Sequence, residues 1–314
     1  MKALNRLFLA VAALALAGTT AQAAPRKLVI EMVTHGQATD PFWSIEKNGA
    51  DLAAKQMGVE VQYRAPNTFN MVRMADLIRA AADQKPAGLI VTVPDYDALK
   101  GPIEQAEAQG IPVIVINTGG TYVKKLHALM YIGEGNYEAG VAAGKRLAAM
   151  GAKDGVCIDH EVGNVSLDHR CAGFKVGFGH KVTILPTTED PSTTESRIEA
   201  LLRRDPKVDA LLGLSAQLGG VPAVDAVAKL GLKRKIFIGS FDLSAEYLKD
   251  VQEGKADFAM DQQPFLQAYL AVVLMANDAR YGIIPATTDL ETGPNFITKN
   301  KAGQVIALAQ KGIR

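Results

Sequence analysis

The sequence has little of what marks several specialised classes of protein. It contains two cysteines, one tryptophan and 6% aromatic residues, and its formal net charge is +1 over 314 residues. A charge so close to neutral gives no electrostatic reason to expect nucleic acid or an anionic membrane surface as a partner. No stretch reaches eighteen uninterrupted apolar residues, so no permanent membrane-spanning helix is expected.

The N-terminus has the pattern of an export signal. Lys2 and Arg6 precede an apolar run over residues 7–16, and a small-residue cleavage pattern ends at Ala23. These features predict a secretory signal peptide over residues 1–23. No cysteine follows the apolar run closely enough to carry a lipid anchor. We therefore expect a soluble mature chain in the periplasm of a two-membrane bacterium, cleaved near Ala23.

The rest of the chain alternates short β-branched runs with longer helical stretches. About 290 residues remain after cleavage. A single hydrophobic core does not usually support so long a chain, so two domains are expected. The alternation is typical of parallel sheets covered by helices on both faces. Strands are expected at residues 28–33, 59–63, 88–93, 111–116, 156–159, 182–185, 210–214, 236–239 and 256–260. Helices are expected at residues 41–58, 71–83, 97–109, 137–150, 167–178, 196–204, 221–230, 245–253 and 264–281.

The predicted fold class is α/β, with two doubly wound parallel-sheet domains. About ten strands are too many for one sheet of this design, and the pattern breaks near Ile132. In such sheets ligands bind beyond the carboxyl ends of the strands. The residues that follow each strand are therefore the candidates for a binding site.

The loop after the first strand carries a carboxylate and two adjacent aromatic residues. Asp40 and Pro41 are typical of a helix N-cap and first helical position. Phe42 and Trp43 come next, and adjacent helix positions point about 100° apart, so we expect at most one ring to be fully buried and the other to face the cleft. A flat ring covers the C–H face of a sugar, while carboxylates and amides bind its hydroxyls. The alternative is that Trp43 only packs between the domains.

Polar residues follow most other strands as well. Each has a structural explanation on its own: Asn117 as a turn residue, Asp242 as an N-cap, Arg170 as a surface cation. Together they place hydrogen-bonding groups at the strand ends of both halves, which favours a shared binding cleft. The candidates at these positions are Asn117, His160, Asn164, Arg170, Ser215, Asp242 and Gln262.

The two cysteines lie close together in the sequence. Cys157 and Cys171 flank one short segment, and an oxidising compartment permits them to pair. The alternative is two buried thiols that pack as small hydrophobic groups. Export favours the disulfide, because a reactive thiol would be exposed to oxidation.

An ordered set of short motifs spans the mature chain. Together with the signal peptide, these motifs resemble the ribose/galactose-type sugar-binding proteins of ABC importers, the type I periplasmic binding protein family. The resemblance implies two α/β domains, joined by three crossovers, that close over a monosaccharide. The motifs are Asp40-Pro41-Phe42-Trp43, Ile111-Pro112-Val113 to Asn117, Arg170-Cys171-Ala172-Gly173-Phe174, Phe241-Asp242 and Asp261-Gln262-Gln263-Pro264.

The resemblance also implies boundaries and roles. Residues 26–131 and 264–292 would form the N-terminal domain, and residues 132–263 and 293–314 the C-terminal domain. Hydroxyl groups would be bound from the first domain, from the second domain and from the hinge. In the first domain, Asp40 and Asn117 would bind hydroxyls, and Phe42 and Trp43 would form aromatic walls. Arg170 and Asp242 would bind from the second domain, and Gln262 from the hinge.

The sequence departs from the ribose binders at three places. Asn117-Thr118 stands where they have an acid followed by arginine, and Ser215 replaces an expected asparagine. Glu189 stands near an expected aromatic residue and is a further candidate. Ribose is therefore not the expected ligand. Another pentose, a hexose, or a polyol such as an inositol or sugar alcohol remains open.

Rival functions find no complete motif. The segment His160-Glu161 lacks the second histidine of a zinc protease helix, and residues 140–146 lack the spacing and the Ser or Thr of a phosphate loop. A sugar-sensing transcription regulator would need a DNA-reading helix pair where the signal peptide stands. We expect no enzyme activity, no cofactor and no metal.

The expected function is capture of a monosaccharide or polyol for an ABC importer. The expected partners are the transmembrane subunits of the permease, and the chain is expected to act as a monomer. The alternative is a periplasmic sensor that presents ligand occupancy to a chemoreceptor or another receptor. Both roles use the closed form as the signal, so the sequence does not separate them.

Overall fold

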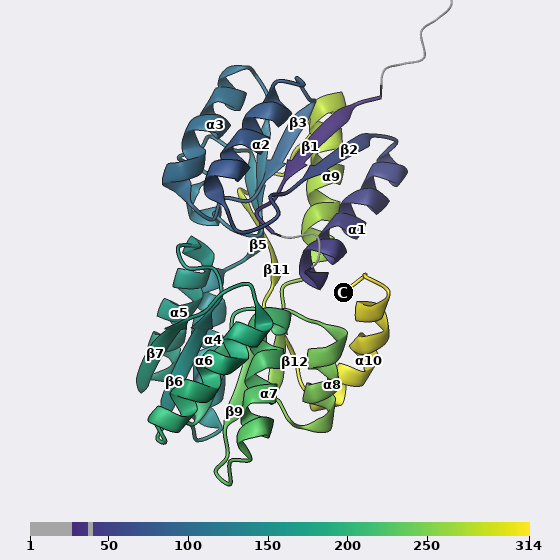
Figure 1. Cartoon of the computed structure of the whole chain (residues 1–314). Helices are drawn as coiled ribbons and strands as arrows, with labels where there is room; N and C mark the ends of the chain where they lie inside the picture. Colours follow the sequence, from purple (N-terminus) through teal and green to yellow (C-terminus); the bar gives the residue numbers. More distant parts are fainter. Residues whose placement is uncertain (1–26, 37–39) are drawn as a thin grey trace, which may run out of the picture.

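The computed structural model describes residues 27–36 and 40–314, so the predicted signal peptide lies outside the described residues. Two α/β halves lie one above the other, each built on its own six-stranded sheet (Figure 1). Within the described ranges, none of the helices combines the length and the apolar character that crossing a membrane requires.

The first sheet has the strand order β11-β5-β4-β3-β1-β2, with parallel pairing throughout. Helices α1 and α9 cover one face, and α2 and α3 cover the other. The strands are β1 (Val29–Val33), β2 (Glu60–Arg64), β3 (Gly88–Val91), β4 (Val113–Ile116), β5 (Met130–Glu134) and β11 (Asp289–Gly293). The helices are α1 (Pro41–Met57), α2 (Met71–Ala82), α3 (Tyr96–Ala108) and α9 (Pro264–Tyr281), with the short turn η1 (Gly120–Tyr122).

The second sheet has the order β12-β10-β9-β8-β6-β7 and is parallel except for the β10–β12 pair. Helices α4 and α5 cover one face, and α6, α7, α8 and α10 cover the other. The strands are β6 (Asp154–Asp159), β7 (Lys181–Pro186), β8 (Ala210–Gly213), β9 (Phe237–Phe241), β10 (Phe258–Asp261) and β12 (Asn295–Ile297). The helices are α4 (Asn136–Ala149), α5 (Val165–Phe178), α6 (Pro191–Arg204), α7 (Val221–Leu230), α8 (Ala245–Glu253) and α10 (Lys299–Gln310), with the π-helical segment η2 (Ala216–Gly220).

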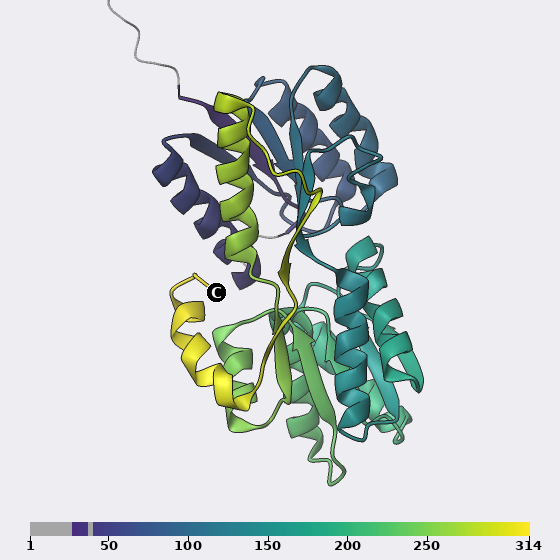
Figure 2. The ribbon, with the colours of Figure 1, turned by 180° about the vertical axis from the view of Figure 1, so that it is seen from behind.

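Three segments carry the chain between the halves. They connect β5 to α4, β10 to α9, and β11 to β12. Figure 2 shows β11 and β12 along one continuous path from the first half to the second. Three short connections at one place leave the halves able to rotate about it, as in hinged binding proteins. The predicted fold class, two doubly wound parallel-sheet domains, is confirmed.

Helices α4 and α5 of the second half pack with their backbones in close contact. A Cβ atom on Gly140 of α4 would collide with the backbone of Arg170, and one on Gly173 of α5 would collide with the backbone of Tyr137. Glycines at these contacts let the two helix backbones touch, because no side chain separates them. The close contact places Arg170 beside the crossover from β5 to α4.

Candidate ligand-binding cleft

A small cavity lies between the two halves, at the carboxyl ends of the central strands of both sheets. We call it the inner chamber. Its volume is about 30 Å³, roughly the share of one water molecule in the liquid. It brings together every predicted ligand-binding residue except Glu189. The lining residues are His35, Asp40, Phe42, Trp43, Asn117, His160, Glu161, Asn164, Ser166, Leu167, Arg170, Leu214, Ser215, Asp242 and Gln262.

The first-domain wall is aromatic. Phe42 and Trp43 are 7% and 6% exposed, and both line the inner chamber. The expectation that one ring would be buried and the other would face the cleft was therefore wrong. Trp43 packs edge-on against both Phe42 and His35, with ring centroids 5.0 Å and 4.6 Å apart. Gly36 lies against the indole, where a Cβ atom would overlap it. The rings support one another beside the chamber.

Asp40 lies at the N-terminus of α1, as its pattern with Pro41 predicts. Its Oδ1 accepts a hydrogen bond from the Phe42 backbone N–H at 2.9 Å. Burial and, to a smaller extent, nearby carboxylates raise the pKa of Asp40 to about 7, although this hydrogen bond acts to lower it. Asp40 can therefore both accept hydrogen bonds and, when protonated, donate one near neutral pH.

Two polar residues at strand ends adopt a left-handed backbone conformation. Asn117 follows β4 with φ 61°, and Asp242 follows β9 with φ 66°. Asn and Asp tolerate this region better than other residues with a side chain. The N-cap of α8 is Ser244, so the structural explanation of Asp242 as that cap is wrong. The turn after each strand directs a short polar side chain into the chamber.

A hydrogen-bonded relay connects the two domains through the hinge. Asn117 Nδ2 donates to Gln262 Oε1 at 3.2 Å, and Gln262 Nε2 donates to Asp242 Oδ1 at 2.6 Å. Gln262 belongs to the crossover between β10 and α9 and is 2% exposed. Burial raises the pKa of Asp242 to about 6, although Arg170 and the Gln262 hydrogen bond oppose this. The relay spans first domain, hinge and second domain.

Arg170 is buried rather than a surface cation. It is 3% exposed, and its Nη2 donates to Glu134 Oε1 at 2.8 Å. Its Nε donates to Asn136 Oδ1 at 2.8 Å, and its guanidinium lies 4.2 Å from the centroid of Phe241. Burial raises the pKa of Glu134 to about 7, with Arg170 opposing this. The crossover residues thus orient the one arginine that reaches the inner chamber.

Several contacts cross the cleft directly. His35 Nε2 of the first domain lies 3.5 Å from Glu161 Oε2 of the second, and Thr118 Oγ1 donates to Asn164 Oδ1 at 3.2 Å. The Val165 backbone N–H also donates to the Pro94 carbonyl at 2.9 Å. The structure is therefore a closed conformation, in which the polar groups of the two walls are partners for one another.

Glu161 is held ionised by this arrangement. Burial raises its pKa, but His35 and the hydrogen bond from Asn164 outweigh that effect, and the pKa of Glu161 is lowered to about 2. Burial also lowers the pKa of His160, whose Nδ1 is buried without a hydrogen-bond partner. A neutral imidazole with an unused nitrogen is a ready partner for a hydroxyl group.

Glu189 lies outside the inner chamber. It lines a second cavity of about 170 Å³, which we call the outer chamber, and its Oε2 accepts from the Phe69 backbone N–H at 3.0 Å. Because α6 begins just after Glu189, the side chain lies at the rim of the cleft. The prediction of a ligand contact for Glu189 does not hold for the inner chamber.

Some residues of the site were not singled out from the sequence. His35, Glu161 and Ser166 line the inner chamber, and Glu134 orients Arg170. His35 and Glu161 belong to strand-end loops that were considered, but the pairing between them spans two domains. Glu134 is the last residue of β5, a strand that the sequence pattern did not reveal. Applying the strand-end rule to that strand would have found it.

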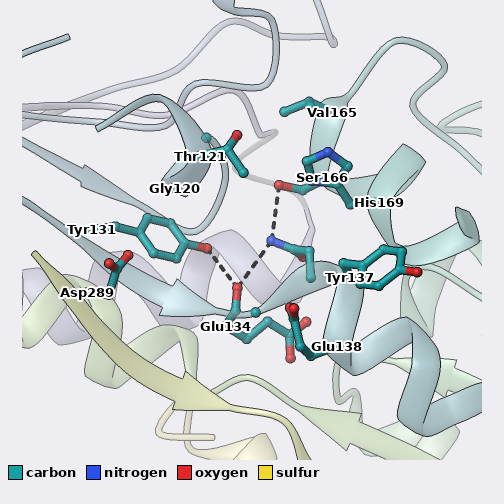
Figure 3. Close-up of a pocket in the computed structure, with 13 residues that line it drawn as sticks. Gly120, Thr121, Tyr131, Glu134, Tyr137, Glu138, Val165, Ser166, His169 and Asp289 are labelled. Atoms are coloured by element: carbon teal, nitrogen blue, oxygen red, sulfur yellow. Dashed lines mark hydrogen bonds between the residues drawn. The ribbon is translucent and has the colours of Figure 1, made fainter. Parts of the chain in front are cut away.

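A larger cavity of about 450 Å³ lies beside the crossover from β5 to α4 (Figure 3), and we call it the crossover cavity. Two of its buried polar groups bond to the protein: Tyr131 Oη donates to the Asn117 carbonyl at 2.6 Å, and Asn136 Nδ2 donates to Ser166 Oγ at 3.2 Å. Glu134 Oε2, which also belongs to the lining, is buried without a hydrogen-bond partner. Tyr137 and Asp289, which also line it, are exposed. None of the predicted ligand-binding residues contributes to this cavity.

Two further observations concern the chemistry of the fold. Cys157 in β6 and Cys171 in α5 form a disulfide in the structure. Across the residues that the structure describes, no cluster of three or more His, Cys, Asp or Glu side chains could hold a metal ion.

Two hinged α/β domains with polar strand ends that face a common cleft are the architecture of a hinged ligand-binding protein. Residues 30–282 match the family described as periplasmic binding protein domain, and the chain belongs to this family. The family assignment agrees with the resemblance drawn from the short motifs.

Three relatives are informative. A carbohydrate transporter from Acidothermus cellulolyticus 11B, solved in complex with myo-inositol, is 33% identical with a TM-score of 0.87, covering 92% of this chain and 100% of that chain. The xylose/arabinose-binding protein XylF from Sulfolobus acidocaldarius is 25% identical over 278 residues, which cover 83% of this chain and 69% of the relative. A chain of the XylFII-LytSN complex is 26% identical with a TM-score of 0.78, covering 88% of this chain and 100% of that chain.

Proposed function

We propose that this chain is the solute-binding component of an ABC importer and captures a neutral monosaccharide or cyclic polyol in the inner chamber. The observation that carries the proposal is the convergence of acceptor and donor side chains from both domains beside an aromatic wall. Carboxylate, amide and guanidinium groups bind neighbouring hydroxyls, while a ring face packs on C–H groups. The residues that would make these contacts are Asp40, Phe42, Trp43, Asn117, His160, Asn164, Arg170, Ser215, Asp242 and Gln262.

The charges around the chamber favour a neutral ligand. Three carboxylates, Asp40, Glu161 and Asp242, line it beside a single arginine. Arg170 is already paired with Glu134 at 2.8 Å. A uronate or sugar phosphate would bring a further negative charge against these carboxylates, which is unfavourable in a desolvated site.

A cyclic polyol of the inositol type is the first ligand to test. The relative solved with myo-inositol is 33% identical over almost the whole chain. A ring that carries a hydroxyl on every carbon would use acceptors on all sides of the chamber, and these come from both domains and the hinge. Pentoses are the second class, because a 25% identical relative is a xylose/arabinose-binding protein.

Binding must open and rebuild the cleft. The inner chamber of about 30 Å³ is smaller than a sugar ring, and its walls contact each other directly. Entry of a ligand therefore requires rotation about the three crossovers, after which ligand hydroxyls replace contacts between the walls. The closed, loaded form is the state that a permease would recognise.

We infer export to the periplasm, with cleavage of the signal peptide near Ala23. The charged start, apolar run and small-residue pattern support this, and the family is periplasmic. N-terminal sequencing of the protein recovered from the periplasm tests it. A mature chain that starts close to residue 24 is expected. An intact Met1 in that fraction would contradict the assignment.

A thermal-shift screen against neutral monosaccharides and polyols tests the binding function. A ligand present at a hundredfold excess over its Kd stabilises the folded state by about 2.7 kcal/mol. Import is tested separately, by measuring ATPase stimulation of the reconstituted permease with and without the loaded protein. A screen in which no neutral sugar or polyol stabilises the protein would contradict the proposal.

A sensory role is the second candidate. The relative in the XylFII-LytSN complex is found in an assembly with a second component, which supports docking of this fold onto another protein. Ligand uptake and ligand-induced gene expression, measured in a strain that lacks this protein, separate the two roles. Loss of uptake identifies an importer component, and loss of induction alone identifies a sensor.

A further inference from the structure

The outer chamber adjoins the inner chamber, and the residues that it adds to the lining are only partly buried. Both are lined by Asp40, Trp43 and Glu161, which form a neck between them. Beyond the neck, the described residues that bound the outer chamber all belong to the second domain: Glu189, Pro191, Gln217 and Leu218. A group attached to a ligand in the inner chamber can therefore extend outward without leaving the cleft.

The walls of the outer chamber combine apolar surfaces with hydrogen-bond acceptors. Trp43, Pro191 and Leu218 supply the apolar surface. Gln217 Nε2 is directed to Glu246 Oε2 at 3.4 Å, which leaves its carbonyl oxygen as an acceptor. The same combination of apolar face and acceptors suits a second polyhydroxylated ring.

The contact between Glu189 and the first domain keeps the chamber defined in the closed state. Glu189 Oε2 accepts from the Phe69 backbone N–H, and the carboxylate has further lone pairs for ligand hydroxyls. Gln217 and Leu218 belong to η2, a π-helical segment that begins directly after Ser215 of the inner chamber. Single π-helical turns are frequent at functional sites.

The size of the outer chamber fits one ring. Its volume of about 170 Å³ compares with the roughly 150 Å³ of a cavity that holds benzene. Widening the inner chamber to admit a ligand separates the domains. Because Asp40 and Trp43 of the first domain also bound the outer chamber, this movement enlarges it as well.

We propose that the outer chamber is a second subsite, which accommodates a neutral substituent such as a glycosyl group linked through oxygen to the bound ring. This inference rests on the proposed function. It extends the ligand class from free polyols and monosaccharides to their neutral ethers and glycosides. The lining carries no lysine or arginine beside its carboxylates, so phosphate and uronate substituents are excluded.

The test is a calorimetric titration with myo-inositol and a panel of its mono-O-methyl ethers, one for each hydroxyl. The inner chamber surrounds the ring except at the neck, so one ether should bind within about tenfold of myo-inositol while the others bind at least about 100-fold more weakly. The myo-inositol derivative that carries a galactosyl group at the tolerated position should then bind as well. If every ether fails while myo-inositol binds, no hydroxyl faces open space and the subsite is overturned.

A variant separates the two chambers. Leu218 lines the outer chamber and not the inner one, so Leu218→Trp narrows the outer chamber beyond the neck. It should weaken the tolerated ether and its galactoside at least about tenfold and leave the affinity for myo-inositol within about twofold. The matched control is Val176→Trp, at a position of α5 that is 63% exposed and lines neither chamber.

The remaining outcomes are distinct. Equal affinity of the Leu218→Trp variant for the free and the substituted ring would overturn the subsite and keep the proposed function. If neither myo-inositol nor any neutral monosaccharide binds to the wild-type protein, the proposed function fails and the subsite with it. Retained binding of myo-inositol by Leu218→Trp also shows that the variant folds.

Discussion

The inner chamber and the crossover cavity share Ser166 as a lining residue, yet they differ in size and in the side chains that they bring together. The crossover cavity has about 450 Å³ and the inner chamber about 30 Å³. In the larger cavity the buried hydroxyl of Tyr131 and amide of Asn136 already bond to neighbouring protein groups. In the smaller one, carboxylates, amides and a neutral histidine meet from two domains that can separate. Volume in a closed structure is therefore a poor guide to function, and polar groups that converge from two separable domains are a better one.

Among the substitutions that distinguish the two cavities, Arg170→Ala should cause the largest loss of ligand affinity. The substitution removes the only arginine of the inner chamber and leaves the Glu134 carboxylate buried without its partner. Loss of one partner of a desolvated charged contact costs about 2 to 5 kcal/mol, so affinity should fall by at least about 100-fold. Breaking the buried pair should also reduce the free energy of unfolding, by about 3 to 5 kcal/mol.

A double variant distinguishes lost binding from lost stability. Glu134→Gln in the Arg170→Ala background removes the stranded charge, so stability by denaturant unfolding should recover while binding by calorimetry should not. Wild-type affinity in the double variant would show that Arg170 serves the hinge alone.

The second largest effect should be a pH dependence of domain closure in the ligand-free protein. Burial in the closed form raises the pKa of Asp40 to about 7 and that of Asp242 to about 6, whereas in an open cleft both should approach ordinary values. The closed form then binds more protons between about pH 4 and 7, so closure is favoured at low pH and lost as pH rises through this range. The negative charges of Glu161 and Glu189 act in the same direction.

Small-angle scattering of the ligand-free protein at pH 5 and pH 8 measures this. A larger radius of gyration is expected at pH 8, with a change in the opening equilibrium of at least about tenfold. Asp40→Asn should reduce the difference. An identical radius at both pH values would show that these carboxyls keep their environment when the domains move.

Trp43 gives a smaller effect on affinity but a direct optical report. It is the only tryptophan in the sequence and lines both chambers. Ligand binding should change its emission saturably, because the domains rearrange around the indole. Trp43→Phe keeps an aromatic face and should weaken binding only several-fold. Saturable binding by calorimetry with an unchanged emission spectrum would remove Trp43 from the site.

The smallest effect is expected in the crossover cavity. His169→Ala changes a side chain that lines only this cavity, and affinity should stay within about twofold of wild type. The matched comparison is His160→Ala, which removes a histidine of the inner chamber and should weaken binding clearly. Equal losses in the two variants would mean that the crossover cavity takes part in binding.

Much of the fold followed from the sequence because apolar runs and helix termini are local signals. The predicted bounds of α7, α8 and α9 agree with the structure, and Asp40 caps α1 as its pattern predicts. Strands β5, β11 and β12 and helix α10 were missed. β11, with the sequence Asp-Leu-Glu-Thr-Gly, and the three-residue β12 have no clear apolar alternation. They are held by pairing with distant strands, which a local pattern cannot reveal.

The site was predictable where one strand end supplies one residue, and unpredictable where residues act in pairs across the fold. Asn117 and Asp242 follow recognisable strands, and the structure brings them to one chamber. The partnership of Arg170 with Glu134 depends on close packing of α4 on α5 and on a strand that the pattern did not show. Glu189 was assigned from the resemblance alone, and the start of α6 places it in the outer chamber instead.

The central claim is that the inner chamber binds one neutral polyhydroxylated ring. Calorimetric titration of the mature protein with myo-inositol, xylose and arabinose, each beside glucuronate as the anionic comparison, tests it most directly. At pH 8 we predict saturable binding of at least one neutral ligand with one site per chain, and affinity for glucuronate at least about 100-fold weaker, because Asp40, Glu161 and Asp242 are then ionised and repel its charge. Tighter binding of glucuronate, or no binding of any neutral ring, would contradict the account.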